Sequence, residues 1–527
     1  MILVLLMLIP LIGGAAAWLV GRAHPTWPRL AALATLAVEA ALALGLWISS
    51  LTTVSITPFY YELRVPWIPA LGITFHLALD GLSLVLIALT AFIGLVAVAL
   101  AWHEIRERTG FFYLNLLWML AGITGVFLAL DLFLFYFFWE LMLVPTYLLY
   151  FWGSPGEENA RQRVRAAVKF FVFTQVSGLL MLVAAIGLAF AHQQATGTLT
   201  FDYPELIGTP VGGTLGLLLM LGFFLAFAVK LPLFPFHTWQ PEAYVQAPTA
   251  VTVVLAGVMA KTAGYGMIRF LVPLFPTAAA EFAPWAFALG VIGVLYGAVL
   301  AFSQRDLKRL IAYSSISHMS LVVLGVFAWN EIALLGATMQ LVAHGVATGA
   351  LFALAAMLEE RTGTRDIYRL GGLWSRQSAL GAIFLLFALA ALGLPGLGNF
   401  VAEFLTLTGT FAVSPIAASL GALGVITSAI YALWMIQRIF FGPAASEERM
   451  ANFTGRESVV LAALVVAIVW LGLFPGAVLD RARQGIGNAM GTSAQSTALI
   501  QPVTLAPELS TSAVGPGSIR DTERGTQ

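Results

Sequence analysis

Residues 223–236, FFLAFAVKLPLFPF, place a lysine and two prolines in a stretch that is otherwise apolar enough to cross a membrane. Pro232 and Pro235 follow directly after Lys230. A proline removes a backbone hydrogen bond and clashes with the preceding helical turn, so this helix is predicted to break inside the membrane. The stretch therefore predicts an interrupted membrane helix with a charge beside the break.

A second stretch, residues 393–407, GLPGLGNFVAEFLTL, repeats the pattern with Pro395 and, a few residues later, Glu403. Along the chain the two breaks fall in the seventh and twelfth apolar segments, each the fourth helix of a five-helix unit. Equivalent broken helices in two units indicate inverted repeats around an ion site near the membrane midplane. The alternative is that Pro and Gly are simply more frequent in membrane helices.

The composition agrees with a membrane protein. The chain has 527 residues, of which 60% are hydrophobic and 10% are charged, against about 25% charged residues in soluble proteins. We predict an all-α integral membrane protein with about fourteen transmembrane helices. The first apolar stretch lacks a basic start and a small-residue cleavage site, so we expect a retained span rather than a signal peptide.

The apolar segments divide the chain into five predicted parts. These are residues 1–110 (helices 1–3), 111–272 (first repeat, helices 4–8), 284–441 (second, inverted repeat, helices 9–13), 458–480 (helix 14) and 481–527 (a polar extramembrane tail, poorly ordered or lying on a neighbour).

Basic residues predict the orientation, because cytoplasmic loops are enriched in Lys and Arg. The even-numbered loops hold only Arg64 and Arg269, and both termini are therefore predicted to lie outside the cytoplasm. The odd-numbered loops hold Arg22, Arg29, Arg106, Arg108, Arg161, Arg163, Arg165, Lys169, Arg305, Lys308, Arg309, Arg361, Arg365, Arg369, Arg376, Arg438, Arg449 and Arg456.

Several chemistries are excluded or unsupported. The chain has no cysteine, which excludes thiolate-held iron–sulfur clusters, cysteine zinc sites and a cysteine nucleophile. Its seven histidines are too scattered for a metal cluster. No phosphate-binding loop or dinucleotide fingerprint is visible, and no basic patch indicates nucleic acid. We expect neither a metal nor a cofactor in this chain.

Ionisable residues inside the apolar segments are the candidates for function. An isolated charge at the centre of the membrane costs at least about 2.5–3.5 kcal/mol, so these groups need partners or water. They are Glu140, Lys230, Lys261, His344, Glu403 and, as a weaker candidate, His318.

Glu140 and Lys230 are predicted to form a pair with two positions. A buried carboxylate and a buried ammonium keep each other charged when they meet and favour their neutral forms when they separate. The pair could thus control whether Lys230 keeps its proton. A static ion pair that locks two helices is the alternative.

Lys261, His318 and His344 would carry protons onward to Glu403, with water bridging gaps longer than a hydrogen bond. Imidazole titrates near neutral pH and suits a relay. The alternatives are a Lys261 side chain that reaches an interface and histidines that only make packing hydrogen bonds.

Three further acidic residues are kept off this path. Glu39 is expected to pack helices or face a subunit, and Asp80 to cap a helix N-terminus. Glu104 is either a solvated loop residue or a secondary proton-uptake group.

Six strings together resemble the antiporter-like subunits of respiratory complex I, NADH–quinone oxidoreductase, most closely the subunit M family, over roughly residues 70–480. They are GFFYLNLLWMLAGITGVFLALDLFLFYFFWELMLVP, AVKLPLFPFHTWQPEAYVQAPTAVTVVLAG, AKTAGYGMIRF, IAYSSISHMS, QLVAHGVATGALF and GLPGLGNFVAEF.

The resemblance implies proton translocation driven by quinone reduction elsewhere in the complex, in a bacterial cell membrane. Glu140 and Lys230 match the family's essential pair, and Lys261 matches its connecting lysine. Glu104 matches a less critical glutamate. Glu403 matches the exit-side carrier, where the sister subunits L and N usually have lysine.

The relay histidines of the family match His318 and His344. The resemblance also implies that NADH, FMN, iron–sulfur clusters and quinone bind to other subunits. It implies that the partners are the other membrane-arm subunits, especially L and N, besides lipids and protons. Two alternatives stay open: a subunit of a cation/proton antiporter or membrane-bound hydrogenase, and an inert scaffold whose buried charges only lock helices.

Overall fold

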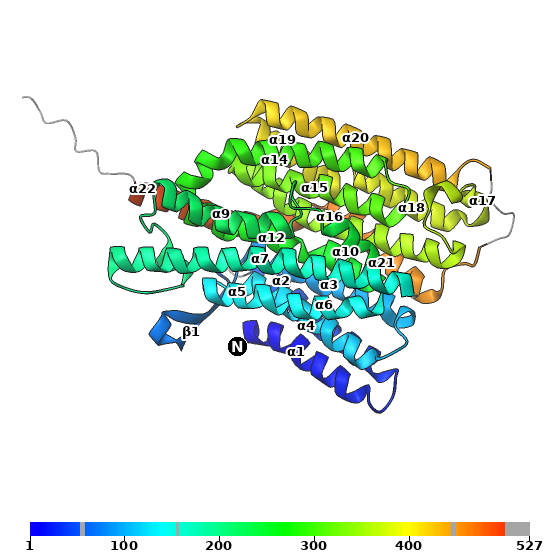
Figure 1. Ribbon diagram of the computed structural model, residues 1–527, viewed down its shortest axis with the longest axis horizontal. Coiled ribbons are helices and arrows are strands. Elements are labelled where there is room, and N and C mark those ends of the chain that lie inside the picture. The colour runs from blue at the N-terminus through cyan, green and yellow to red at the C-terminus, as the bar shows by residue number, and fades with distance from the viewer. Residues whose placement is uncertain (53–57, 154–156, 444–449, 501–527) are drawn as a thin grey trace, which may run out of the picture.

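A bundle of long apolar helices makes up most of the computed structural model, which describes residues 1–52, 58–153, 157–443 and 450–500 (Figure 1). Thirteen helical segments in this described part are long and apolar enough to cross a membrane. The shorter helices α18 and α19 fall in the predicted twelfth span and are below that length. The prediction of a helical multi-span membrane protein is confirmed.

The first half of the chain contains α1 (Ile2–Val20), α2 (Trp27–Thr52), α3 (Gly81–Glu104), α4 (Thr109–Leu128), α5 (Leu132–Leu141), α6 (Leu143–Leu149), α7 (Glu157–Thr196), the short α8 (Tyr203–Leu206), α9 (Gly213–Lys230), α10 (Gln240–Gln246), α11 (Thr249–Val254), α12 (Lys261–Gly266) and α13 (Val272–Leu274). The second half contains α14 (Pro276–Phe302), α15 (Leu307–Ala328), α16 (Glu331–Thr362), α17 (Leu373–Arg376), α18 (Ser378–Ala391), α19 (Gly398–Phe411), α20 (Pro415–Phe440), α21 (Gly455–Leu473) and α22 (Gly476–Ile500).

Both predicted breaks are present. Helix α9 ends at Lys230, and α10 begins only at Gln240, beyond the two prolines. Helix α18 ends at Ala391 and α19 begins at Gly398, so the second break surrounds Pro395. These interruptions free backbone groups and leave room for polar side chains at the same depth. The inverted relation of the two units and the five-part division stay predictions.

Lys261 lies in a third irregular span, which the sequence did not predict. Two π-helical turns, η3 (Leu255–Met259) and η4 (Met267–Leu271), flank the helix that begins with Lys261. A π-turn shifts the backbone hydrogen bonds and releases a carbonyl group. The carbonyl of Ala256 accepts a hydrogen bond from the Lys261 ammonium.

The centre of the bundle consists of the span Thr249–Leu274 together with α15 and α16, which are almost entirely buried. By contrast, α1, α2 and α21 expose most of their apolar surface. The central spans carry Lys261, His318 and His344, so these groups are shielded from lipid by protein.

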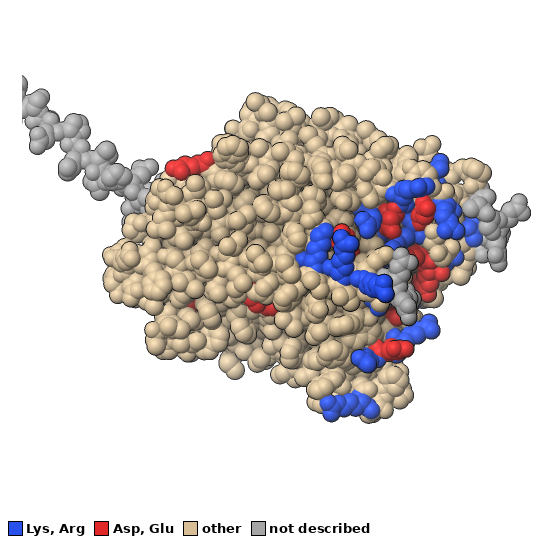
Figure 2. All heavy atoms as spheres, viewed as in Figure 1, with Lys and Arg blue, Asp and Glu red and all other residues tan. Residues whose placement is uncertain are grey.

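Charged side chains gather at one end of the bundle, which we call the basic end (Figure 2). Helix α17 marks this end in Figure 1, and Arg365 lies in the loop that leads to it. The Leu307 N–H donates to the Arg365 carbonyl, which brings the loop of Arg305 beside it. Met1 lies at the opposite end (Figure 1). Arg449 falls outside the described residues.

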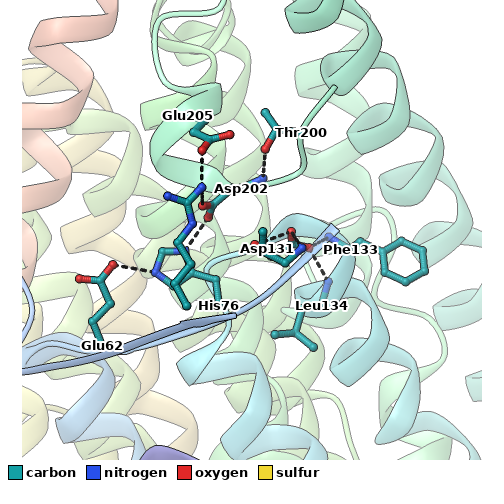
Figure 3. Close-up of polar contacts among 10 residues, drawn as sticks. Glu62, His76, Asp131, Phe133, Leu134, Thr200, Asp202 and Glu205 are labelled. Carbon is teal, nitrogen blue, oxygen red and sulfur yellow. Dashed lines mark hydrogen bonds and ion pairs between the residues drawn. The ribbon is translucent and has the colours of Figure 1, made fainter. Parts of the chain in front are cut away.

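At the end opposite the basic end, a small antiparallel hairpin departs from the predicted all-helical structure. Strands β1 (Tyr61–Ile68) and β2 (Ile73–Leu79) pair between α2 and α3. Asp202, just before α8, binds both strands of the hairpin (Figure 3): its carboxylate lies 2.6 Å from Arg64 Nη2 and 2.6 Å from His76 Nδ1. Within the hairpin, Glu62 lies 2.9 Å from His76 Nε2. Partial burial raises the pKa of Glu205, but hydrogen bonds from Thr200 and Arg64 outweigh it, so the pKa lies below its usual value.

The tail from residue 481 was predicted to be poorly ordered or to lie on a neighbour. The first of these expectations is wrong as far as residue 500, since α22 continues through it. Ala482, Ile486 and Ala489 form an apolar stripe at helical spacing and are buried. Gly485 lies so close to α3 that an added Cβ atom would be 2.9 Å from a carboxylate oxygen of Asp80. The stripe is short and lies among polar residues, so the composition of this segment did not predict a packed helix. Residues 501–527 lie outside the described residues.

Candidate functional site

Lys261 and His344 are in direct contact at the centre of the bundle. The Lys261 Nζ atom lies 2.8 Å from Nδ1 of His344, and neither side chain is exposed. The other ring nitrogen of His344 lies 3.0 Å from the hydroxyl of Thr348, one turn along α16. A lysine donor on Nδ1 and a hydroxyl acceptor on Nε2 fit a neutral imidazole protonated at Nε2.

His318 continues the line from His344 towards Glu403. The rings of His344 and His318 have centroids 5.9 Å apart. His318 Nδ1 lies 3.2 Å from Oε1 of Glu403, without the alignment of a hydrogen bond, and its Nε2 lies 3.1 Å from the hydroxyl of Tyr431. Four predicted site residues from α12, α16, α15 and α19 thus form one buried series.

Glu403 is held at the second helix break. An added Cβ atom on Gly393 would lie 2.3 Å from Oε2 of Glu403, and Gly393 has a φ of 78°. Glycine is therefore required there both for its backbone conformation and for the carboxylate.

Glu140 and Lys230 do not meet in this structure. No ion pair of Lys230 is present within the described ranges, and its Nζ lies 3.8 Å from the ring centroid of Trp139. Glu140 is half-buried, and its Oε1 atom has no hydrogen-bond partner among the described residues. The geometry corresponds to the separated position of the predicted pair.

A polar segment continues from Lys230 through the first break. His237 and Gln240 are buried there, and His237 Nδ1 and both side-chain polar atoms of Gln240 lack partners in the described chain. Buried polar atoms of this kind are commonly satisfied by water. No direct contact joins Lys230 to Lys261 in the described residues, so proton transfer between these two lysines would need bridging water.

Glu104 borders a cavity of about 630 Å³ at the basic end, with Lys308 and Arg456 among its other lining residues. Its carboxylate accepts hydrogen bonds from the backbone N–H groups of Thr249 (2.7 Å) and Ala250 (3.3 Å), at the start of the span that carries Lys261. The carboxylate is thus fixed by the backbone, which a free loop residue would not be.

The two remaining acidic residues, Glu39 and Asp80, are both buried. Glu39 is buried, and its Oε1 atom accepts a hydrogen bond from the Thr124 hydroxyl at 3.2 Å, which joins α2 to α4. Its role, in helix packing or towards a subunit, stays a prediction. Asp80 caps α3 through the Ser83 N–H. Asp80 also forms a buried ion pair with Arg269. The assignment of Arg269 to an outer loop was wrong, because apolar residues on both sides extend the helix past it.

Sequence reasoning also missed Tyr431, Trp139 and Gln240 as neighbours of the charged groups. Trp139 could have been suspected because it adjoins Glu140, and Gln240 because it belongs to a polar run after the break. Nothing local distinguishes Tyr431 from other aromatic residues of its helix.

The described helices include thirteen that are long and apolar enough to cross a membrane. Together with the broken helices and the internal series of ionisable groups, they define a polytopic membrane protein of the ion-translocating class. Comparison with known proteins is more specific. Residues 129–430 match the family model described as NADH:quinone oxidoreductase/Mrp antiporter, transmembrane. The chain belongs to this family.

The chain is similar to NADH-quinone oxidoreductase subunit M of Pseudomonas aeruginosa, with 48% identity over 94% of this chain and all of the relative. It is 47% identical to subunit M of Escherichia coli K12, over 95% of this chain and all of that one. Among solved structures, a chain of respiratory complex I from Thermus thermophilus matches with a TM-score of 0.83 and 33% identity, over 95% of this chain and 100% of that chain. The predicted resemblance is confirmed.

A chain of the Mrp complex from Dietzia has the same fold, with a TM-score of 0.79 at 21% identity over 94% of this chain and 99% of that chain.

Proposed function

We propose that this chain is the M-type membrane subunit of an NADH–quinone oxidoreductase and translocates protons across the bacterial cell membrane. The observation that carries the proposal is the buried series Lys261, His344, His318 and Glu403. Each member can bind and release a proton, and ionisable groups inside membrane spans commonly mark ion paths and proton relays. The relatives supply the complex in which this transfer would be driven.

The proposed direction follows from charge. The basic end would face the cytoplasm, because Lys and Arg are retained on that side. Met1 would then lie outside, as predicted. Protons would be taken up on the cytoplasmic side, through the Glu104 cavity and the first break beside Lys230, and released outward beyond Glu403.

Glu140 is proposed to couple this chain to its neighbour. Its half-buried position places a carboxylate where another membrane-arm subunit could influence it. The L-type and N-type subunits are the proposed neighbours. NADH, FMN, iron–sulfur clusters and quinone are assigned to other subunits, and this chain is proposed to contribute no redox centre.

The test uses the assembled complex in membrane vesicles. Glu140→Gln and, separately, Lys230→Ala are each expected to lower the protons pumped per NADH oxidised. Glu39→Gln is the matched control, since it neutralises a buried carboxylate away from the series and keeps the hydrogen bond to Thr124. Full pumping by an assembled complex in both site variants would refute proton translocation by this chain.

A further inference from the structure

The immediate neighbour of the Lys230 ammonium is an aromatic face. Lys230 is 2% exposed, and its Nζ lies 3.8 Å from the ring centroid of Trp139. Neither a hydrogen bond nor an ion pair of this side chain is present in the described part of the chain. The indole face is therefore in direct contact with the ammonium, while the Glu140 carboxylate acts on it only at longer range.

Trp139 and Glu140 are consecutive residues of α5, and successive helical residues point about 100° apart. The indole of Trp139 packs against Phe135 and against Phe227 of α9, with centroids 5.7 and 5.6 Å apart. The Glu140 carboxylate lies against α7, where an added Cβ atom on Gly178 would be 2.3 Å from Oε1 and 3.6 Å from Cδ1 of the Trp139 indole. Helix α5 thus offers Lys230 two attractive groups, of which only the indole is in contact with the ammonium.

The indole and the carboxylate differ in how strongly they attract the ammonium and in how much solvation they lose when they bind it. An aromatic face attracts the ammonium through its quadrupole and attracts the neutral amine much less. A carboxylate attracts the ammonium more strongly, but it must give up its own solvation to do so. The flexible four-carbon stem of lysine allows the charge to move between them.

We infer that Trp139 is a positioning residue that holds the protonated Lys230 in its position away from Glu140. This inference rests on the proposed function and adds a physical reason for the separated state of the pair. The ring sets the balance between the two positions of the lysine. It makes no contact with Glu403 or the histidines and carries no proton itself.

The test replaces Trp139 by tryptophans with one to four ring fluorines, introduced at this position alone in the full-length chain of the assembled complex. Fluorine withdraws charge from the ring face and leaves the shape nearly unchanged. Fluorine also makes the indole N–H more acidic, but Nε1 of Trp139 has no hydrogen-bond partner in the described residues, so that change has no recorded contact to act on.

We expect the rate of proton pumping to fall stepwise with each fluorine, by about ten-fold for the fully fluorinated ring, because the charge preference of Lys230 shifts with the ring quadrupole. The rate of proton pumping should fall less in Trp139→Phe, which keeps an aromatic face, than in Trp139→Leu, which removes it. The control is the same series at Trp118, whose Nε1 donates to the carbonyl of Leu11 and whose ring has no cation above it among the described residues.

Suppose that Glu140→Gln and Lys230→Ala abolish pumping but that all variants of the Trp139 series pump equally. That result would overturn this inference and leave the proposed function intact. An equal decline in the Trp139 and Trp118 series would also overturn it. Full pumping in the Glu140 and Lys230 variants would instead overturn the proposed function, and the inference with it.

Discussion

The side-chain nitrogen of Lys261 lies 2.8 Å from Nδ1 of His344. The Lys261 ammonium also donates a hydrogen bond to the carbonyl of Ala256 in the preceding π-turn, and this bond helps to orient it. A proton that leaves Lys261 therefore has an imidazole nitrogen directly in its path. The distance from Lys261 to His344 is that of a single proton transfer.

His344→Gln should lower proton pumping about ten-fold or more, because no other described side chain connects Lys261 to His318 and an amide does not titrate in this range. Thr348→Val is the control for orientation, since it removes only the partner of Nε2, and a smaller loss is expected. Pumping per NADH in reconstituted vesicles is the measurement. Unchanged pumping in the glutamine variant would remove His344 from the relay.

Gly393→Ala should impair pumping more than Gly396→Ala. Both glycines have positive φ values, 78° and 95°, so alanine strains the backbone by about 1–2 kcal/mol at each. Only at Gly393 would the new Cβ atom meet the Glu403 carboxylate, because nothing lies within 4 Å at Gly396. The comparison separates backbone strain from displacement of Glu403. Equal losses in the two variants would mean that strain alone is responsible.

Gly178→Ala should reduce pumping through Glu140, whose Oε1 atom would lie 2.3 Å from the added Cβ. The carboxylate must move, which changes its balance with Lys230. Gly45→Ala serves as the control, since it is also a helical glycine and its Cβ would meet nothing within 4 Å. Gly45→Ala should leave pumping unchanged and slightly stabilise its helix. A normal pumping ratio in Gly178→Ala would show that the position of Glu140 is not critical.

Arg269→Met should destabilise the chain by about 3–5 kcal/mol, since it leaves the buried Asp80 carboxylate without its partner. The measurement is the temperature at which the purified complex loses this subunit. The double variant with Asp80→Asn should recover part of the loss, because no charge is then left unpaired. No recovery in the double variant would show that packing, not charge, dominates at this position.

Much of the fold could be predicted because the length of an apolar segment and the position of its prolines affect the helix in which they lie. The apolar segments, the break after Lys230 and the break at Pro395 all follow from short stretches. The hairpin β1–β2 and helix α22 could not be predicted in the same way. Their residues are too polar for a membrane signal, and they are ordered by contacts with distant segments, such as that of Gly485 with Asp80.

The candidate site was predicted as a set of residues but not as a geometry. Which ionisable side chains are buried at a cost follows from the sequence, since charge in an apolar stretch is visible without a structure. Their contacts depend on helix packing, which brings Lys261 to His344, Glu403 to His318, and Lys230 to Trp139 rather than to Glu140. The cost of burying a charge depends on that residue and its neighbours in the sequence. The partner of each charge depends instead on how helices that are far apart in the chain pack together.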